Sequence, residues 1–204
     1  MILLVGSRGN IGGRYAAILR YLKIDFVGVD VGDKWPDPST YDKAIVATPT
    51  STHYKICLRL AKLKKTFLCE KPLSKNPEEI QHLIDIGADG YMVNNWCHVT
   101  EKIIKPNSAK VYYDCWNTGK DGLLWDCIQL VYIARGNNFK INNQHPIFWA
   151  TIDLRAGSNR IGLEKIAHSY CYMIDCFIEE KTDKLWSLKD ALAATKKVLK
   201  YEQG

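Results

Sequence analysis

Short apolar runs alternate with amphipathic stretches through the first half of the chain. Each run is bounded by turn residues, a pattern typical of buried strands in a parallel sheet. The runs lie at residues 2–5, 26–29, 44–47, 67–69 and 91–93.

The stretches between these runs predict helices. Apolar residues recur at helical spacing over residues 11–22. Residues 53–65 predict a mostly apolar helix with one narrow polar stripe. A third helix begins with Asn76 as its cap and Pro77 at its first position. Strands that alternate with helices predict an α/β fold, a doubly wound parallel sheet of the Rossmann type over residues 1–94.

The pattern changes after residue 94. Longer runs rich in aromatic and β-branched residues predict strands at 109–116 and 147–154, and helical spacing predicts helices at 122–134 and 166–178. Ser187 and Asp190 form a capping box for a last helix. Turns around the sheet are predicted at Asn137, Asn138, Asn142, Asn143 and Gln144.

Residues 95–204 therefore predict a small α+β domain for substrate binding or dimerisation, with about three or four strands. The aromatic strand at 111–116 fits a dimer face, a flat substrate platform or the domain core. We expect a homo-oligomer formed through this sheet.

Composition and charge narrow the class of protein. With 47% hydrophobic and 25% charged residues, the 204-residue chain is globular in composition. No apolar run is long enough to span a bilayer, and the first run meets Gly6 too soon for a signal peptide, so we expect a cytoplasmic protein without a membrane partner. The net charge of +6 comes from lysines spread along helical faces, which argues against a nucleic-acid partner. Seven cysteines without a C-x-x-C pair indicate reduced thiols and no metal site.

A glycine-rich loop follows the first strand and opens the first helix. It comprises Gly6, Ser7, Arg8, Gly9, Asn10, Ile11 and Gly12. In this context Gly9 lets the backbone approach a pyrophosphate, and Gly12 lets the helix pack closely on the strand. The phosphates would meet the helix N-terminus, where the dipole is positive.

An acidic residue strengthens the prediction of a dinucleotide site. Asp30 ends the second strand, 18 residues after Gly12, where a carboxylate accepts hydrogen bonds from the adenosine ribose. A carboxylate there repels a 2′-phosphate and favours NAD over NADP, whereas Arg8 keeps NADP open.

Two further motifs are more specific. They are Ala-Ile-Val-Ala-Thr-Pro-Thr-Ser-Thr-His at 44–53 and Phe-Leu-Cys-Glu-Lys-Pro-Leu-Ser at 67–74. Together with the glycine loop they make the chain resemble the glucose–fructose oxidoreductase, inositol dehydrogenase and MocA family of NAD(P)-dependent enzymes, as a shortened member. The resemblance covers almost the whole first half and resumes at residues 121–126 and near the C-terminus.

The resemblance implies roles for residues of these motifs. It places cofactor contacts at Thr48, Pro49, His53, Glu70 and Lys71. Lys71 is also the implied catalytic residue, near the nicotinamide and the reacting carbon, where an ammonium holds a substrate oxygen and assists proton movement.

The second half departs from the family pattern. Asp126 matches the aspartate of the family's D-x-x-x-H element and is the second implied catalytic residue, but Leu130 replaces the histidine. The family's arginine after the fifth strand is replaced by Asn-Asn-Trp-Cys at 94–97, where we expect Asn95 to contact the cofactor. The weaker candidates to replace the histidine are His98, His168 and Tyr132.

These observations favour an NAD(P)-dependent oxidoreductase that transfers a hydride between nicotinamide and a hydroxyl or carbonyl group of a small sugar- or polyol-like substrate. Two alternatives stay open. One is a dinucleotide-binding sensor or partner subunit that has lost catalysis, suggested by the missing histidine. The other is a reductase of a larger, flat substrate, similar to biliverdin reductase.

Overall fold

The computed structural model describes residues 1–100, 103–114, 124–142, 149–153, 158–161 and 163–203. The chain forms two compact units. The first comprises Met1–Val93 and Trp186–Leu192, and the second comprises Asn94–Leu185 and Ala193–Gly204.

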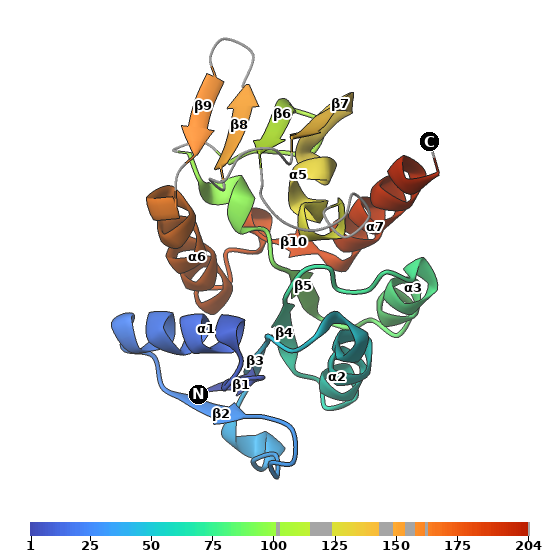
Figure 1. The fold of residues 1–204 in the computed structure, drawn as a ribbon. Coiled ribbons are helices and arrows are strands. Elements are labelled where there is room, and N and C mark those ends of the chain that lie inside the picture. Colours follow the sequence, from blue (N-terminus) through green and yellow to red (C-terminus); the bar gives the residue numbers. More distant parts are fainter. Residues whose placement is uncertain (101–102, 115–123, 143–148, 154–157, 162, 204) are drawn as a thin grey trace. The chain divides into compact units, whose positions relative to one another are not determined.

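The first unit is built on a six-stranded sheet (Figure 1). Five strands are parallel, and the short last strand runs antiparallel at one edge. In the order β10-β5-β4-β3-β1-β2 they are β10 (Trp186–Ser187), β5 (Gly90–Met92), β4 (Thr66–Cys69), β3 (Lys43–Val46), β1 (Ile2–Val5) and β2 (Phe26–Val29). This sheet confirms the predicted Rossmann fold, and each apolar run became one strand.

Helices cover both faces of this sheet, with α1 on one face and α2 and α3 on the other (Figure 1). They span α1 (Asn10–Tyr21), α2 (Thr50–Lys62) and α3 (Pro77–Asp85), and a 3₁₀ turn, η1 (Pro38–Thr40), precedes β3. Because both faces are covered, all four residues of β1 are buried. The predicted cap of α3 is present: the Asn76 side chain accepts a hydrogen bond from the Glu78 N–H at 3.0 Å.

One strand of this sheet was not predicted. Trp186 and Ser187 return to the first unit and pair with Met92 and Tyr91 of β5. Residues 186–192 therefore lie in the first unit, although the sequence pattern assigned them to the expected second domain. A strand of two residues is too short to produce an alternating pattern.

The second unit carries a four-stranded mixed sheet in the order β7-β6-β8-β9. Strand β6 pairs in parallel with β7 and antiparallel with β8, and β8 is antiparallel to β9. The strands are β6 (Ala109–Asp114), β7 (Ala134–Asn142), β8 (Trp149–Asp153) and β9 (Ser158–Ile161). The helical segments are η2 (Asn95–His98), α5 (Ile128–Ile133), α6 (Leu163–Ile178), η3 (Thr182–Lys184) and α7 (Leu188–Glu202). Helix α7 begins in the first unit.

The prediction of turns at Asn137, Asn138 and Asn142 was wrong, because all three lie in β7. The signal has a local cause. Ala109 faces Ala134 whereas Val111 already faces Phe139, so residues 135–138 form an irregular bulge, with Gly136 at a φ of +52°. Asn143 and Gln144 lie outside the described residues, as do the ends of the predicted strands at 115–116, 147–148 and 154.

The capping box of the last helix is present as predicted. The Asp190 carboxylate accepts hydrogen bonds from the Ser187 N–H at 2.9 Å and hydroxyl at 2.7 Å, and the Asp190 N–H donates to the Ser187 hydroxyl at 3.3 Å. The six described cysteines are free, and Cys115 lies outside the described residues. In the described part of the chain, every helix is too short or too polar to cross a membrane.

Candidate cofactor-binding site

A cleft of about 690 Å³ lies at the carboxyl ends of β1, β2 and β3. Strand β1 has β2 on one side and β3 on the other, so the strand order reverses here, and α/β sheets bind their ligands at such a point. Five residues predicted to bind the cofactor line this cleft: Gly6, Gly9, Asp30, Thr48 and Pro49.

The glycine loop forms one wall, and two of its glycines have no room for a side chain. Gly6 has a φ of +88°, and a Cβ there would lie 2.5 Å from the Ala47 carbonyl oxygen. A Cβ on Gly12 would lie 1.9 Å from the Gly6 carbonyl oxygen. The close packing predicted for Gly12 is therefore present. Ser7 lies against β2, because a Cβ on Gly28 would approach its hydroxyl to 2.6 Å.

Helix α1 begins in this loop without a side-chain cap. Gly9 is its N-cap residue, Asn10 and Ile11 are in its first turn, and that turn holds no acidic residue. The first N–H groups of a helix lack intrahelical acceptors and carry the positive end of the dipole. The loop and helix start therefore fit an anionic pyrophosphate, with no carboxylate in the first turn to oppose it.

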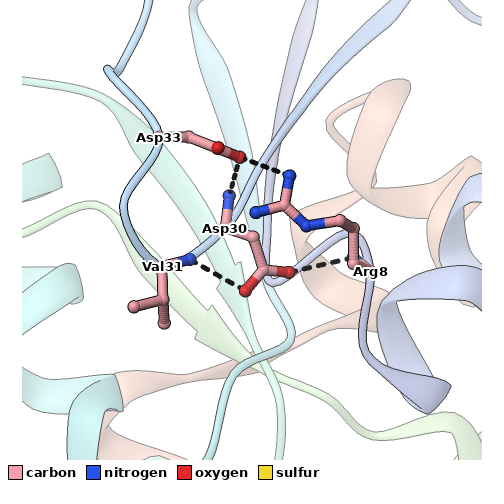
Figure 2. Close-up of polar contacts among 4 residues, drawn as sticks. All are labelled: Arg8, Asp30, Val31 and Asp33. Carbon is pink, nitrogen blue, oxygen red and sulfur yellow. Dashed lines mark hydrogen bonds and ion pairs between the residues drawn. The ribbon is translucent and has the colours of Figure 1, made fainter.

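Asp30 is fixed at the end of β2 by backbone donors (Figure 2). Its two carboxylate oxygens accept the Val31 N–H at 2.8 Å and the Arg8 N–H at 3.0 Å. These hydrogen bonds lower the pKa of Asp30, so the side chain is ionised at neutral pH. The site therefore presents a fixed carboxylate of the kind that accepts hydrogen bonds from ribose hydroxyls.

The opposite wall comes from α2 and the loop after β2. Thr52 and Ile56 of α2 line the cleft, and so does Val31, whose side chain is 93% exposed. The Arg59 guanidinium lies 3.8 Å from the centre of the Trp35 ring. None of these five residues was predicted from the sequence. The order of residues along α2 does not show which of them face the cleft, and Val31 and Trp35 lie in the loop after β2 outside any motif.

Glu70 and Lys71 form the turn that follows β4. Glu70 is buried, and its carboxylate accepts the Tyr15 hydroxyl at 2.7 Å and the Lys71 N–H at 3.0 Å. Tyr15 belongs to α1, the helix that begins at the cofactor cleft. The carboxylate predicted to contact the cofactor is thus used to fix the backbone of Lys71, whose side chain is half-buried.

His53 holds the other end of this turn. Its ring is buried on α2, with Nδ1 2.8 Å from the Pro72 carbonyl oxygen and Nε2 2.7 Å from the Thr48 carbonyl oxygen. The ring therefore links the turn after β4 to the turn after β3, which lines the cleft. Helices α1 and α2, which both begin at the cleft, therefore also hold the turn that carries Lys71.

Tyr15→Phe tests the first of these contacts. We expect it to lower the free energy of unfolding by about 1–3 kcal/mol, because the buried Glu70 carboxylate loses a hydrogen-bond donor. Urea unfolding measures the change. The matched control is Tyr54→Phe, whose hydroxyl bonds His82 at the surface, with an expected loss below about 0.5 kcal/mol. Equal losses in the two variants would contradict this account of Glu70.

The sequence matches one family model over residues 29–90, described as an oxidoreductase family with an NAD-binding Rossmann fold and corresponding to the glucose–fructose oxidoreductase, inositol dehydrogenase and MocA family. The match runs from the end of β2 to the start of β5 and contains Asp30 and Lys71. Over this segment the chain is similar to the family. The predicted resemblance is confirmed, and the dinucleotide of the family is NAD. No curated protein matches the chain.

Solved structures of proteins described as dehydrogenases share the fold of this chain. A putative myo-inositol dehydrogenase from Sinorhizobium meliloti 1021 aligns with a TM-score of 0.73 and 13% identity, over 97% of this chain and 94% of that chain. A probable dehydrogenase from Thermotoga maritima aligns with a TM-score of 0.73 and 16% identity, over 97% of this chain and 94% of that chain. The WlbA (WbpB) dehydrogenase from Thermus thermophilus was crystallised in complex with NAD and UDP-GlcNAcA. It aligns with a TM-score of 0.66 and 13% identity, over 97% of this chain and 92% of that chain.

The second unit holds the other predicted site residues. Asp126 is exposed in a helical stretch at 124–126, and Leu130, which stands where the family has a histidine, is completely buried in α5. Residues 121–123 of that motif lie outside the described residues. Core packing thus accounts for the leucine.

Asn95 is buried in a polar network of the second unit. Its amide oxygen accepts from Gln129 Nε2 at 3.0 Å, and its amide nitrogen donates to the Ser169 hydroxyl at 3.3 Å. Gln129 in turn accepts the Trp96 N–H at 3.0 Å. This network holds η2 against α5 and α6, and the cofactor contact expected of Asn95 stays a prediction.

The weaker histidine candidates differ in their surroundings. His98 is buried with its ring centre 5.2 Å from that of Tyr172, and burial lowers its pKa to about 4. The imidazole is therefore neutral and weakly basic at pH 7. His168 is exposed on α6, and Tyr132 is half-buried on α5.

Proposed function

We propose that this oxidoreductase transfers a hydride between nicotinamide and a hydroxyl or carbonyl group of a small sugar- or polyol-like substrate. The observation that carries the proposal is the position of Lys71: its turn is held by Tyr15 through Glu70 and by His53, which belong to the two helices that begin at the dinucleotide cleft. The fold is also that of a putative myo-inositol dehydrogenase and of a dehydrogenase crystallised with a nucleotide sugar, which supports this substrate class.

The chain's own residues position the reactants and handle charge and protons. The glycine loop and the start of α1 hold the pyrophosphate, and Asp30 accepts hydrogen bonds from the ribose. In the reducing direction the Lys71 ammonium donates a hydrogen bond to the substrate oxygen, stabilises the negative charge that develops on it and gives its proton to that oxygen. In the oxidising direction the neutral Lys71 amine accepts the hydroxyl proton as the hydride leaves. Asp126 is the second proposed catalytic residue and orients the substrate. When bound, the nicotinamide supplies the hydride donor or acceptor.

Titration of the purified protein with NADH and with NADPH tests the dinucleotide site directly. Nicotinamide fluorescence reports binding without any knowledge of the substrate. We expect NADH to bind with the lower dissociation constant, because Asp30 repels a 2′-phosphate. Failure of both dinucleotides to bind would overturn the proposed function. If one of them binds, a panel of sugars and polyols identifies the substrates that oxidise or reduce the bound cofactor.

A second candidate function is a dinucleotide-responsive partner subunit without turnover. Leu130 favours it, since a buried leucine stands where the family's acid–base residue is found. Such a protein would bind NADH but oxidise or reduce none of the panel. Substitution of Lys71 would then leave its partner-dependent signal intact.

Self-association through the second-unit sheet is part of the proposal. Strands β7 and β9 are the edges of that sheet, and an edge strand offers unpaired backbone groups to a second copy. The side chains of the aromatic strand beyond Val111 lie outside the described part of the chain.

A further inference from the structure

The loop after β2 folds into a tight turn beside the glycine loop. The Asp33 N–H donates to the Asp30 carbonyl oxygen at 3.0 Å, which closes a four-residue turn. Gly32 occupies its third position with a φ of +85°, the conformation that a type II turn requires there. The turn therefore fixes where the Asp33 carboxylate lies relative to Asp30.

The Asp33 carboxylate ties this turn to the glycine loop (Figure 2). Its Oδ2 atom accepts the Asp30 N–H at 2.8 Å and also the Arg8 guanidinium Nη1 at 2.8 Å. The Arg8 main-chain N–H donates to the other carboxylate, Asp30 Oδ2, at 3.0 Å. Asp33 thus pairs with the Arg8 guanidinium while Asp30 holds the Arg8 main chain, and both carboxylates line the cleft.

Both carboxylates are charged at neutral pH. The Arg8 hydrogen bond lowers the pKa of Asp33, and the Val31 and Arg8 N–H groups lower the pKa of Asp30. The ion pair is open to solvent, with 64% of the Arg8 side chain and 34% of the Asp33 side chain exposed. An anionic group of a bound ligand can therefore compete with Asp33 for the Arg8 guanidinium. The strength of the Arg8–Asp33 ion pair affects how tightly that group binds.

This arrangement bears on the choice between NAD and NADP. The 2′-phosphate of NADP carries close to two negative charges, and an arginine near the ribose is the usual residue that accommodates it. Arg8 lies beside Asp30, but its guanidinium is held in an ion pair with Asp33. Lys55 and Arg59 line the cleft from α2, and Arg59 is stacked on Trp35.

We propose that Asp33 is a specificity-determining residue that holds Arg8 in an ion pair and so weakens the binding of NADP relative to NAD. The role depends on the proposed function, in which this cleft binds a nicotinamide dinucleotide. Asp30 repels the 2′-phosphate directly, whereas Asp33 acts through Arg8. The two acids therefore make separable contributions to the preference for NAD.

Fluorescence titration with NADH and NADPH tests the role of Asp33 in a double-mutant cycle of D33N, R8A and R8A/D33N. Asparagine keeps an acceptor for the Asp30 N–H and removes only the charge. We expect D33N to lower the NADPH dissociation constant about tenfold and to change that of NADH less than about threefold. The gain should shrink at high salt, because the released charge is exposed.

In the R8A background, D33N should no longer increase NADPH affinity, so R8A/D33N and R8A should have the same NADPH dissociation constant. The reason is that the cation that Asp33 restrains is gone. The matched control is D42N, which removes an exposed carboxylate elsewhere on the first unit and should alter neither affinity. A D33N variant with unchanged NADPH affinity, or a gain that persists in R8A/D33N, overturns the role of Asp33. Wild-type protein that binds neither dinucleotide overturns instead the proposed function on which that role depends.

Discussion

Gly12→Ala is expected to weaken NADH binding by about a hundredfold or more. The new Cβ would lie 1.9 Å from the Gly6 carbonyl oxygen and 2.8 Å from the Gly6 carbonyl carbon. Both contacts are with backbone, so the glycine loop itself must shift. That shift moves the N–H groups at the start of α1 away from the pyrophosphate position. Fluorescence titration with NADH measures the loss.

The adjacent glycine provides a matched control. A Cβ on Gly13 would meet nothing within 4 Å, and the residue is exposed in the first turns of α1. Gly13→Ala should therefore leave NADH affinity within about threefold, and it should stabilise the protein by about 0.5–1 kcal/mol because alanine favours the helix. Similar losses of NADH affinity in both variants would show that the clash with Gly6 is not the cause.

The Rossmann unit could be predicted from the sequence because its signals are local. Each buried parallel strand is a short apolar run, and Asn76 and Pro77 mark the start of α3 as they do in the structure. The strand formed by Trp186 and Ser187 could not be predicted, since its position depends on pairing with residues nearly a hundred positions earlier. Gly136 and its neighbouring asparagines gave a true signal of irregular backbone, which belongs to a bulge and not to a turn.

The candidate site was predictable to a similar depth. The glycine loop and Asp30 are close to strand ends, so their convergence on one cleft follows from the parallel order of the strands. Tyr15 was recognised only as an apolar position of a helix, and its hydroxyl contact with Glu70 joins residues 55 positions apart. The pairing of Arg8 with Asp33 likewise depends on a three-dimensional turn that no single motif contains.

Lys71→Ala is expected to reduce turnover by about a thousandfold on any sugar or polyol that the wild-type protein oxidises or reduces. The variant removes the ammonium that holds the substrate oxygen and stabilises its developing charge. NADH affinity should fall far less than turnover, by at most about tenfold through the cofactor contact expected of Lys71, because the glycine loop and Asp30 are unchanged. Steady-state kinetics and NADH titration on the same samples separate the chemical step from cofactor binding.

Lys71→Arg and Lys62→Ala complete this test. Arginine keeps the positive charge but places it on a planar group with a different reach, so we expect only partial recovery of turnover. Lys62 is exposed in the last turn of α2, and its loss should leave both measurements unchanged. Near-normal turnover in Lys71→Ala would contradict the proposed chemistry, even if NADH binding is intact. In that case the turn of Glu70 and Lys71, which Tyr15 holds through the Glu70 side chain and His53 through the Pro72 carbonyl, would serve only to hold the Rossmann unit together.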